Sequence, residues 1–308
     1  MKKIITTGSI GVDYVFLVDK LPNKGQSIIS KKFEVFCGGK GANQAVSLGK
    51  LGASVKMIGH VGNDENGNIS IKNLMDNSID TKYVKKVSNY TTQIANIVVD
   101  DNGDNLLIVD VGANFSFTRE EVEDYKHLID EADIVLTQLE TSIEFIEEFL
   151  KYAKEKNKIV ILNPGPAKLI SKDLIQCCDF ITPNETELCI LLNKEYTEDF
   201  ETLKKYAFEL QDISQKNVIV TLGINGSMWI NEKKEFKKYE AYKIKAVDAT
   251  AAGDTFMGGF TTYLAMNKNI DECIRYATAA SALAVTKLGA QSSIPSKKEV
   301  EEFIKKNN

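Results

Sequence analysis

The chain has 308 residues, of which 43% are hydrophobic and 26% are charged, and its formal net charge is −5. These values are typical of a globular protein with one large domain, and the net acidity argues against a broad nucleic-acid surface, which needs clustered positive charge. There is neither a secretory signal nor an apolar run long enough to span a bilayer, and five cysteines without C-x-x-C spacing indicate reduced thiols in a cytoplasmic protein.

The first predicted strand, Ile4 to Thr7, runs directly into the segment Gly8-Ser9-Ile10-Gly11-Val12-Asp13. This order places the Asp13 carboxylate near the carboxyl end of a strand, where open α/β sheets bind their ligands. Taken alone, an aspartate at this position is more often a turn residue.

Two stretches, residues 14–36 and 91–109, have the character of antiparallel strands, and Asp101-Asn102-Gly103-Asp104 predicts a hairpin turn in the second. A small sheet needs a partner that covers its apolar face. We therefore expect the two stretches to join as one small sheet, which acts as a lid over a site and also contacts a second copy of the chain.

A glycine-rich helix start lies between these stretches, in Gly38-Gly39-Lys40-Gly41-Ala42-Asn43-Gln44-Ala45. Its glycines allow a polar ligand to approach the backbone closely, and Lys40 and Asn43 add hydrogen-bond donors. The pattern is neither a Walker A loop nor a G-x-G-x-x-G fingerprint.

From about residue 130, short apolar strands alternate with amphipathic helices. The predicted strands are Ile134–Thr137, Ile159–Leu162, Phe180–Thr182 and Val218–Leu222, and the predicted helices are Ile143–Lys156, Glu185–Leu192 and Phe200–Gln211. This alternation predicts a mostly parallel sheet covered by helices on both faces, a three-layer α/β/α core. We expect one domain over residues 1–308.

Two further strand ends carry polar groups. Asn184 and Glu187 lie three residues apart after the third of these strands, which suits either the water shell of Mg²⁺ or a helix capping box, and the spacing alone favours the capping box. After the fourth strand, Thr221-Leu222-Gly223-Ile224-Asn225-Gly226-Ser227 predicts either a simple hairpin or a loop that holds nucleotide phosphates.

The segment Ala251-Ala252-Gly253-Asp254-Thr255-Phe256 places a carboxylate on a turn of small residues. A strand is predicted before it, at Tyr242–Val247, and a helix after it, at Thr255–Met266. The first N–H groups of a helix lack partners and form an anion site, and here a potential base stands inside that site. A plain helix start with an acidic residue is the alternative reading of this segment alone.

Together these motifs resemble those of the ribokinase family of ATP-dependent sugar kinases, also called the PfkB carbohydrate kinases, over essentially the whole chain. The resemblance implies that Asp254 is the general base and that the N–H groups of Ala251, Ala252, Gly253 and Asp254 bind the transferring phosphate. By the same resemblance, the sugar-contacting positions are Gly11, Asp13, Gly39, Lys40, Gly41, Ala42, Asn43 and Glu140. By this resemblance, the residues that contact the nucleotide are Asn184, Thr221, Gly223, Asn225, Gly226, Gly253 and Thr278.

The resemblance also implies two cations. Mg²⁺ would be held through water by Asn184 and Glu187. An activating K⁺ would be bound by the side chains of Asp248 and Ser293 and by the carbonyls of Thr250, Ala284, Lys287 and Gly289.

The function so implied is phosphorylation of the 5-hydroxyl of D-ribose by ATP. The predicted lid separately indicates a homodimer in which two small sheets pack together. Gly11 departs from the asparagine common in the family, and the loss of that side chain leaves a 2-deoxyribose or nucleoside kinase as an alternative. A silent sugar-binding protein is a further alternative, against which the intact Asp254 argues.

Overall fold

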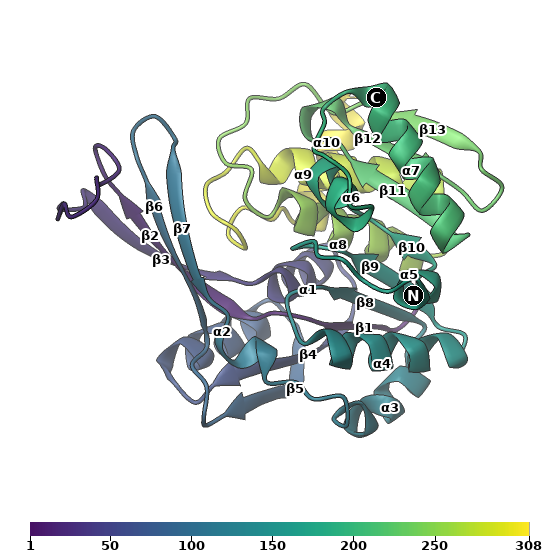
Figure 1. The fold of residues 1–308 in the computed structure, drawn as a ribbon, viewed down its shortest axis with the longest axis horizontal. Helices are drawn as coiled ribbons and strands as arrows, with labels where there is room; N and C mark the ends of the chain where they lie inside the picture. The colour runs from purple at the N-terminus through teal and green to yellow at the C-terminus, as the bar shows by residue number, and fades with distance from the viewer. Residues whose placement is uncertain (308) are drawn as a thin grey trace.

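The computed structural model describes residues 1–307, and its frame is a nine-stranded sheet in the order β13-β12-β11-β10-β9-β8-β1-β4-β5. Neighbouring strands from β5 to β11 are parallel, and β12 and β13 add an antiparallel edge. The strands are β1 Ile4–Thr7, β4 Val55–Gly62, β5 Asp80–Val87, β8 Ile134–Gln138, β9 Ile159–Asn163, β10 Phe180–Ile181, β11 Asn217–Thr221, β12 Ser227–Ile230 and β13 Phe236–Tyr239. The predicted, mostly parallel sheet is confirmed (Figure 1).

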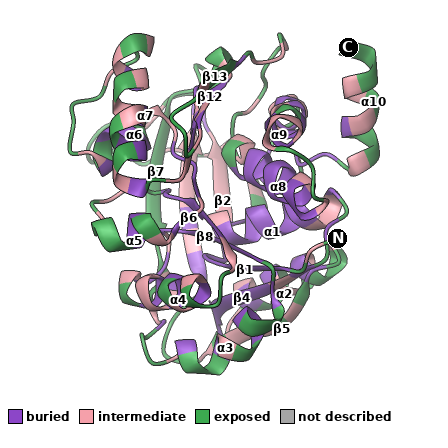
Figure 2. Ribbon diagram, turned by 90° about the vertical axis from the view of Figure 1, so that its right-hand side faces the viewer, coloured by how far each residue is buried: buried purple, intermediate pink, exposed green. Residues whose placement is uncertain are grey.

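Helices cover both faces of this sheet, which confirms the three-layer prediction. One face packs against α3 Val122–Glu131, α4 Ile143–Glu155, α5 Lys172–Cys177, α6 Glu185–Leu191 and α7 Phe200–Ser214. The other packs against α1 Lys40–Lys50, α2 Glu65–Asp76 and α8 Ala252–Ala265, with α9 Ile270–Ala284 on α8 and α10 Lys297–Asn307 on α9. Alternate residues of a strand pack in the two cores: Val135 of β8 joins the first, and Ile134 and Leu136 join the second. Figure 2 shows the buried residues concentrated on the central strands and on α8.

A second sheet, in the order β3-β2-β6-β7, projects from this core (Figure 1). Its strands are β2 Gly11–Leu17, β3 Lys32–Gly38, β6 Gln93–Val99 and β7 Asn105–Asp110. The predicted joining of residues 14–36 with 91–109 is confirmed, but the expectation of antiparallel strands is wrong at the centre, where β2 and β6 are parallel. Both strands continue from parallel strands of the large sheet, β1 and β5, so both leave the same edge in the same direction.

The prediction of a strand at Tyr242–Val247 is wrong. In the described chain, residues 240–247 form neither helix nor strand. This segment follows the edge strand β13, and its last backbone N–H, that of Val247, donates to the carbonyl of Val285 after α9. The other predicted strands and helices are present with shifts of a few residues at their ends. Within residues 1–307, no helix combines the length and apolar character needed to cross a membrane.

The start of α1 packs directly on the backbone that follows β1. A Cβ atom at Gly41 would lie 2.5 Å from the carbonyl carbon of Gly8. Because backbone atoms cannot move aside as a side chain can, we expect Gly41→Ala to lower the free energy of unfolding by about 1–3 kcal/mol, measured by urea denaturation. The matched control is Gly253→Ala, whose added Cβ would meet no atom within 4 Å. Equal stability of the two variants would contradict this account.

Candidate active site

Asp254 lies in the first turn of α8 and is only 5% exposed. Its Oδ1 accepts a hydrogen bond of 2.9 Å from Gln44 Nε2, and its Oδ2 accepts one of 2.9 Å from Asn43 Nδ2. Gln44 is itself held, because its Nε2 also donates to Asn163 Oδ1 and its Oε1 accepts from Gln138 Nε2. Two amide side chains of α1 therefore fix the orientation of the carboxylate on α8.

The turn before α8 leaves backbone donors free beside this carboxylate. Ala251 caps the helix in the left-handed conformation, with φ of 58°. The N–H of Ala252 donates to the carbonyl of Ala249, whereas the N–H groups of Gly253 and Asp254 have no acceptor in the described part of the chain. Gly253 is exposed, and its missing side chain leaves open space above these donors. This geometry suits an anion at the start of α8.

Lys40, the first residue of α1, directs its side chain toward the same region. A Cβ at Gly165 would lie 3.4 Å from Lys40 Nζ and 2.5 Å from Glu187 Oε1, so the ammonium and the carboxylate both lie close to Gly165. The negative charge of Asp254 raises the pKa of Lys40 above its ordinary value, with smaller contributions from Glu140 and Glu187, although burial opposes the shift. Lys40 is therefore a positive charge among carboxylates.

Glu140 follows β8 and links the starts of β2 and α1. Its Oε2 accepts from the Lys40 backbone N–H at 3.1 Å and from the Ser9 hydroxyl, and the Ser9 Oγ in turn accepts from the Gly41 N–H at 3.3 Å. Gly39 caps α1 with φ of 85° and offers no side chain, so Glu140 supplies the missing cap from a distant segment.

Asp13 projects from β2 next to this group. Burial, and then the charges of Glu140 and Asp254, raise the pKa of Asp13 to about 6. A Cβ at Gly38 would lie 2.6 Å from its carboxylate, so the glycine leaves room for it. The charges of Glu140, Glu187 and Asp254 thus act on Lys40, and Asp13 lies close to two of these carboxylates, Glu140 and Asp254.

Asn184 and Glu187 form the capping box that their spacing predicts. Asn184 Oδ1 accepts from the Glu187 N–H at 2.8 Å, and Glu187 Oε2 accepts from the Asn184 N–H at 2.9 Å. Glu187 Oε1 accepts no hydrogen bond from residues 1–307, and burial raises the pKa of this carboxyl. Asn184 also lies beside Thr221 through a parallel bridge, which brings two of the predicted nucleotide positions together.

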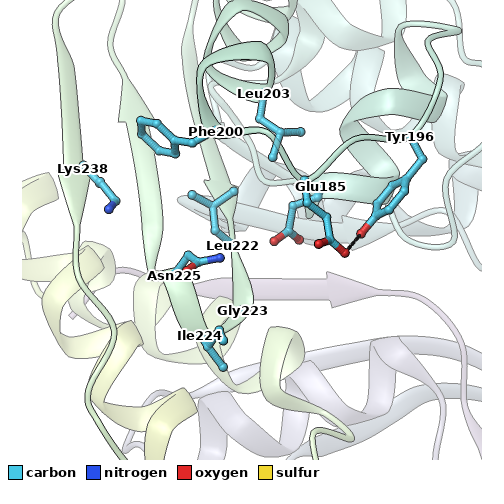
Figure 3. A pocket seen from close by; sticks show the side chains of 10 residues that line it. Glu185, Tyr196, Phe200, Leu203, Leu222, Gly223, Ile224, Asn225 and Lys238 are labelled. Atoms are coloured by element: carbon cyan, nitrogen blue, oxygen red, sulfur yellow. Dashed lines mark hydrogen bonds between the residues drawn. The ribbon is translucent and has the colours of Figure 1, made fainter.

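The loop after Thr221 is a tight hairpin between β11 and β12, with Gly223 and Gly226 both at positive φ. It borders a cavity of about 530 Å³ whose other side is formed by α6 and the segment leading into α7 (Figure 3). The cavity is lined by Glu185, Tyr196, Glu198, Phe200, Leu203, Leu222, Gly223, Ile224, Asn225 and Lys238. The hairpin reading is confirmed, and the loop also has space beside it for a ligand.

Thr278 is not among the residues that line this cavity. It lies on α9 one turn before Ser281, whose hydroxyl donates to the Ala252 carbonyl at 2.9 Å. The two residues share a helix face, so Thr278 lies near the turn of Gly253 instead.

Most of the predicted monovalent-cation ligands also come together. Asp248 Oδ1 accepts from the N–H and hydroxyl of Thr250, and its Oδ2 accepts from the Gly289 N–H at 2.9 Å. Over residues 1–307 the carbonyls of Thr250, Lys287 and Gly289 accept no hydrogen bond, while that of Ala284 accepts from the Lys287 N–H. The Ser293 hydroxyl donates to the Ala290 carbonyl.

No role was predicted for Gln44, Gln138 and Asn163, which together orient the carboxylate of Asp254. Gln44 stands inside the quoted glycine-rich block, but its bond to Asp254 joins residues 210 positions apart. Among the described residues, no group of three or more His, Cys, Asp or Glu side chains is arranged to bind a metal directly.

Residues 1–297 match the family described as pfkB family carbohydrate kinase. A ribokinase of Haemophilus influenzae is 37% identical over 305 residues, which cover 99% of each protein. A deoxyribokinase of Salmonella typhi is 33% identical over 305 residues, again 99% of each. The structure of Arabidopsis thaliana ribokinase complexed with ribose and ATP superposes with a TM-score of 0.93 at 31% identity, and the match covers 99% of both chains.

Proposed function

Because this chain belongs to the pfkB family of carbohydrate kinases, we propose that it transfers the γ-phosphoryl group of ATP to the 5-hydroxyl of D-ribose. The observation that carries the proposal is the Asp254 carboxylate, fixed by two amides beside two free N–H groups and facing Lys40. Similarity to a ribokinase whose structure contains ribose and ATP supports the choice of both substrates.

In this mechanism Asp254 accepts the proton of the sugar hydroxyl as its oxygen attacks the γ-phosphorus, and ADP leaves. Phosphoryl transfer needs mainly in-line positioning and stabilisation of negative charge. The N–H groups of Gly253 and Asp254 donate to the transferring phosphate, and the Lys40 ammonium offsets its charge. Asp13, Asn43 and Glu140 hold the sugar hydroxyls, while Asn184 and the loop from Thr221 to Gly226 hold the nucleotide.

Asn184 and Glu187 fit a hydrated Mg²⁺ better than direct coordination, because the capping box occupies one side-chain oxygen of each. Glu187 Oε1 remains available to accept from a metal-bound water. When bound with ATP, the metal supplies neutralisation of phosphate charge.

Asp248 and the free carbonyls of Thr250, Lys287 and Gly289 fit a monovalent cation, since carbonyl oxygens are ligands for such ions. A cation held there neutralises Asp248 and fixes the segment that leads into α8. We include Ala284 and Ser293 in this proposed site, with K⁺ as the activating ion.

The test is ATP-dependent phosphorylation of ribose, 2-deoxyribose, fructose and common nucleosides. We expect ribose to give the highest kcat/KM, EDTA to abolish turnover, and replacement of K⁺ by a large organic cation to lower it. Restored activity on adding Mg²⁺ back serves as the control for EDTA. A panel led by 2-deoxyribose or a nucleoside would keep the chemistry and overturn the choice of sugar, in line with the similarity to a deoxyribokinase.

The small sheet has an exposed apolar face, which supports the proposed homodimer. Register places Phe33, Val35, Leu106 and Ile108 on the face opposite to Asp13, and Ile108 is 63% exposed. We expect a dimer at micromolar concentration in sedimentation, and a shift to monomer in Ile108→Lys. Leu169→Lys, at an exposed position outside this sheet, is the control, and a monomeric parent protein would contradict the dimer. The five free cysteines support the cytoplasm as its compartment.

A further inference from the structure

Gly11 and Gln93 are cross-strand partners at the base of the small sheet, where β2 and β6 leave the core. A Cβ at Gly11 would lie 2.9 Å from each of three Gln93 atoms, its Cβ, its Cγ and its carbonyl oxygen. Real Cβ atoms essentially never lie within 3.0 Å of such a heavy atom. The Gln93 side chain therefore occupies the place that a side chain at position 11 would take.

The carboxamide of Gln93 is oriented by a single neighbour. Its Oε1 accepts a hydrogen bond of 2.7 Å from Asn114 Nδ2, and Asn114 is in turn fixed to both the N–H and the carbonyl of Ile10. This bond sets which end of the amide faces Asn114, so Nε2 points elsewhere. Gln93 is 6% exposed, and no residue from 1 to 307 accepts a hydrogen bond from its Nε2. This Nε2 atom is not fully enclosed by the described residues, so a ligand that enters the site can supply the acceptor that they do not.

Gln93 lies on the same face of the sheet as Asp13. In a parallel pair, residues in register point to the same side, so Gly11 and Gln93 share a face, and Asp13 shares it as the second residue after Gly11. The pKa of Asp13 responds to Asp254 and Glu140, which shows that this face is turned toward the catalytic group.

We propose that Gln93 is a sugar-binding residue, whose Nε2 donates to a hydroxyl of the bound pentose from the place left open by Gly11. This inference rests on the proposed function and extends it. The amide that is missing at Gly11 is thereby supplied by Gln93 of the neighbouring strand.

The test compares kinetic constants of Gln93→Ala and Gln93→Met with those of the parent enzyme. Methionine fills nearly the same volume but carries no donor. In both variants we expect the KM for ribose to rise about tenfold, the loss of one buried hydrogen bond, with kcat and the KM for ATP within twofold of the parent. Thermal unfolding of each variant is measured alongside.

A double variant separates binding from packing. Gly11→Asn alone brings two side chains into the same space, so we expect lower stability and a raised KM for ribose. Adding Gln93→Gly removes the two side-chain atoms of the collision and leaves only the backbone carbonyl oxygen of residue 93. It also returns an amide to the same face, so we expect the double variant to be more stable than Gly11→Asn and to recover part of the ribose affinity.

Four outcomes decide the matter. A raised ribose KM in both single variants, with recovery in the double variant, supports the proposal. An unchanged ribose KM in an active enzyme overturns the role of Gln93 and leaves the proposed function standing. Parallel losses in ribose KM, ATP KM and thermal stability indicate a purely structural role and also overturn it. A parent protein that phosphorylates no pentose overturns both.

Discussion

Asp254→Asn is expected to lower kcat by at least about 10²–10⁴-fold, the range of general-base catalysis, and to leave the affinity for sugar nearly intact. The asparagine keeps the shape of the side chain, but its amide cannot take up the proton of the attacking hydroxyl. The measurement is the single-turnover rate with ATP, together with calorimetric binding of ribose to the same variant.

A fall in kcat that comes from a disturbed structure around residue 254 must be separated from one that comes from loss of the base. Both oxygens of Asp254 accept from amide donors, so the new amide group faces Asn43 or Gln44 with a donor of its own. Thermal unfolding of the variant reports this mismatch. The control is Asp271→Asn, a carboxylate on α9 that pairs with Lys237 and Arg275 outside the site. Full activity of Asp254→Asn would contradict the mechanism, and a parent protein that binds ribose without turnover would indicate a silent sugar-binding protein.

Asp13→Asn is expected to make the protein more stable at pH 7.5 and to weaken its binding of sugar. The folded protein holds the pKa of Asp13 at about 6, against 3.8 for the free side chain. Ionised Asp13 therefore lowers the free energy of unfolding. This loss grows as pH rises from about 4 to 6 and reaches about 3 kcal/mol at most above pH 6. Asparagine carries no charge, so this cost is absent in the variant.

Urea denaturation at several pH values tests the effect on stability. The gain of Asp13→Asn should be largest above pH 6 and should disappear as pH falls toward 4. In the parent enzyme, the KM for ribose should rise as pH falls through 6, because protonated Asp13 loses an acceptor for a sugar hydroxyl. In the variant, KM should be high and nearly independent of pH in this range. A variant less stable than its parent at pH 7.5 would contradict the pKa assignment.

The sequence was sufficient for elements whose signal is local. The turn of Ala251 to Asp254 could be predicted because small residues precede a helical pattern, and the capping box of Asn184 and Glu187 because its two partners lie three residues apart. The inner strands β8 to β11 were predictable for the same reason, since each is a short apolar run near an amphipathic helix. The edge strands β5 and β13 are rich in lysine and carry no such run.

Features that depend on contacts between residues far apart in the chain could not be predicted from the sequence. The parallel pairing of β2 with β6 follows from the directions of β1 and β5, which only the assembled sheet defines. The contact of Gln44 with Asp254 and the cap that Glu140 places on α1 join segments 210 and 100 residues apart. At Gly11, the sequence indicated a missing amide, whereas the structure shows the side chain of Gln93 in that space.

The packing of Gly11 against Gln93 constrains the order in which this pair of residues arose. A side chain at both positions produces overlapping atoms, so an ancestor with asparagine at 11 that acquired glutamine at 93 first would pass through a destabilised intermediate. The opposite order, glycine at 11 and then glutamine at 93, passes only through an enzyme with an empty space in its sugar site.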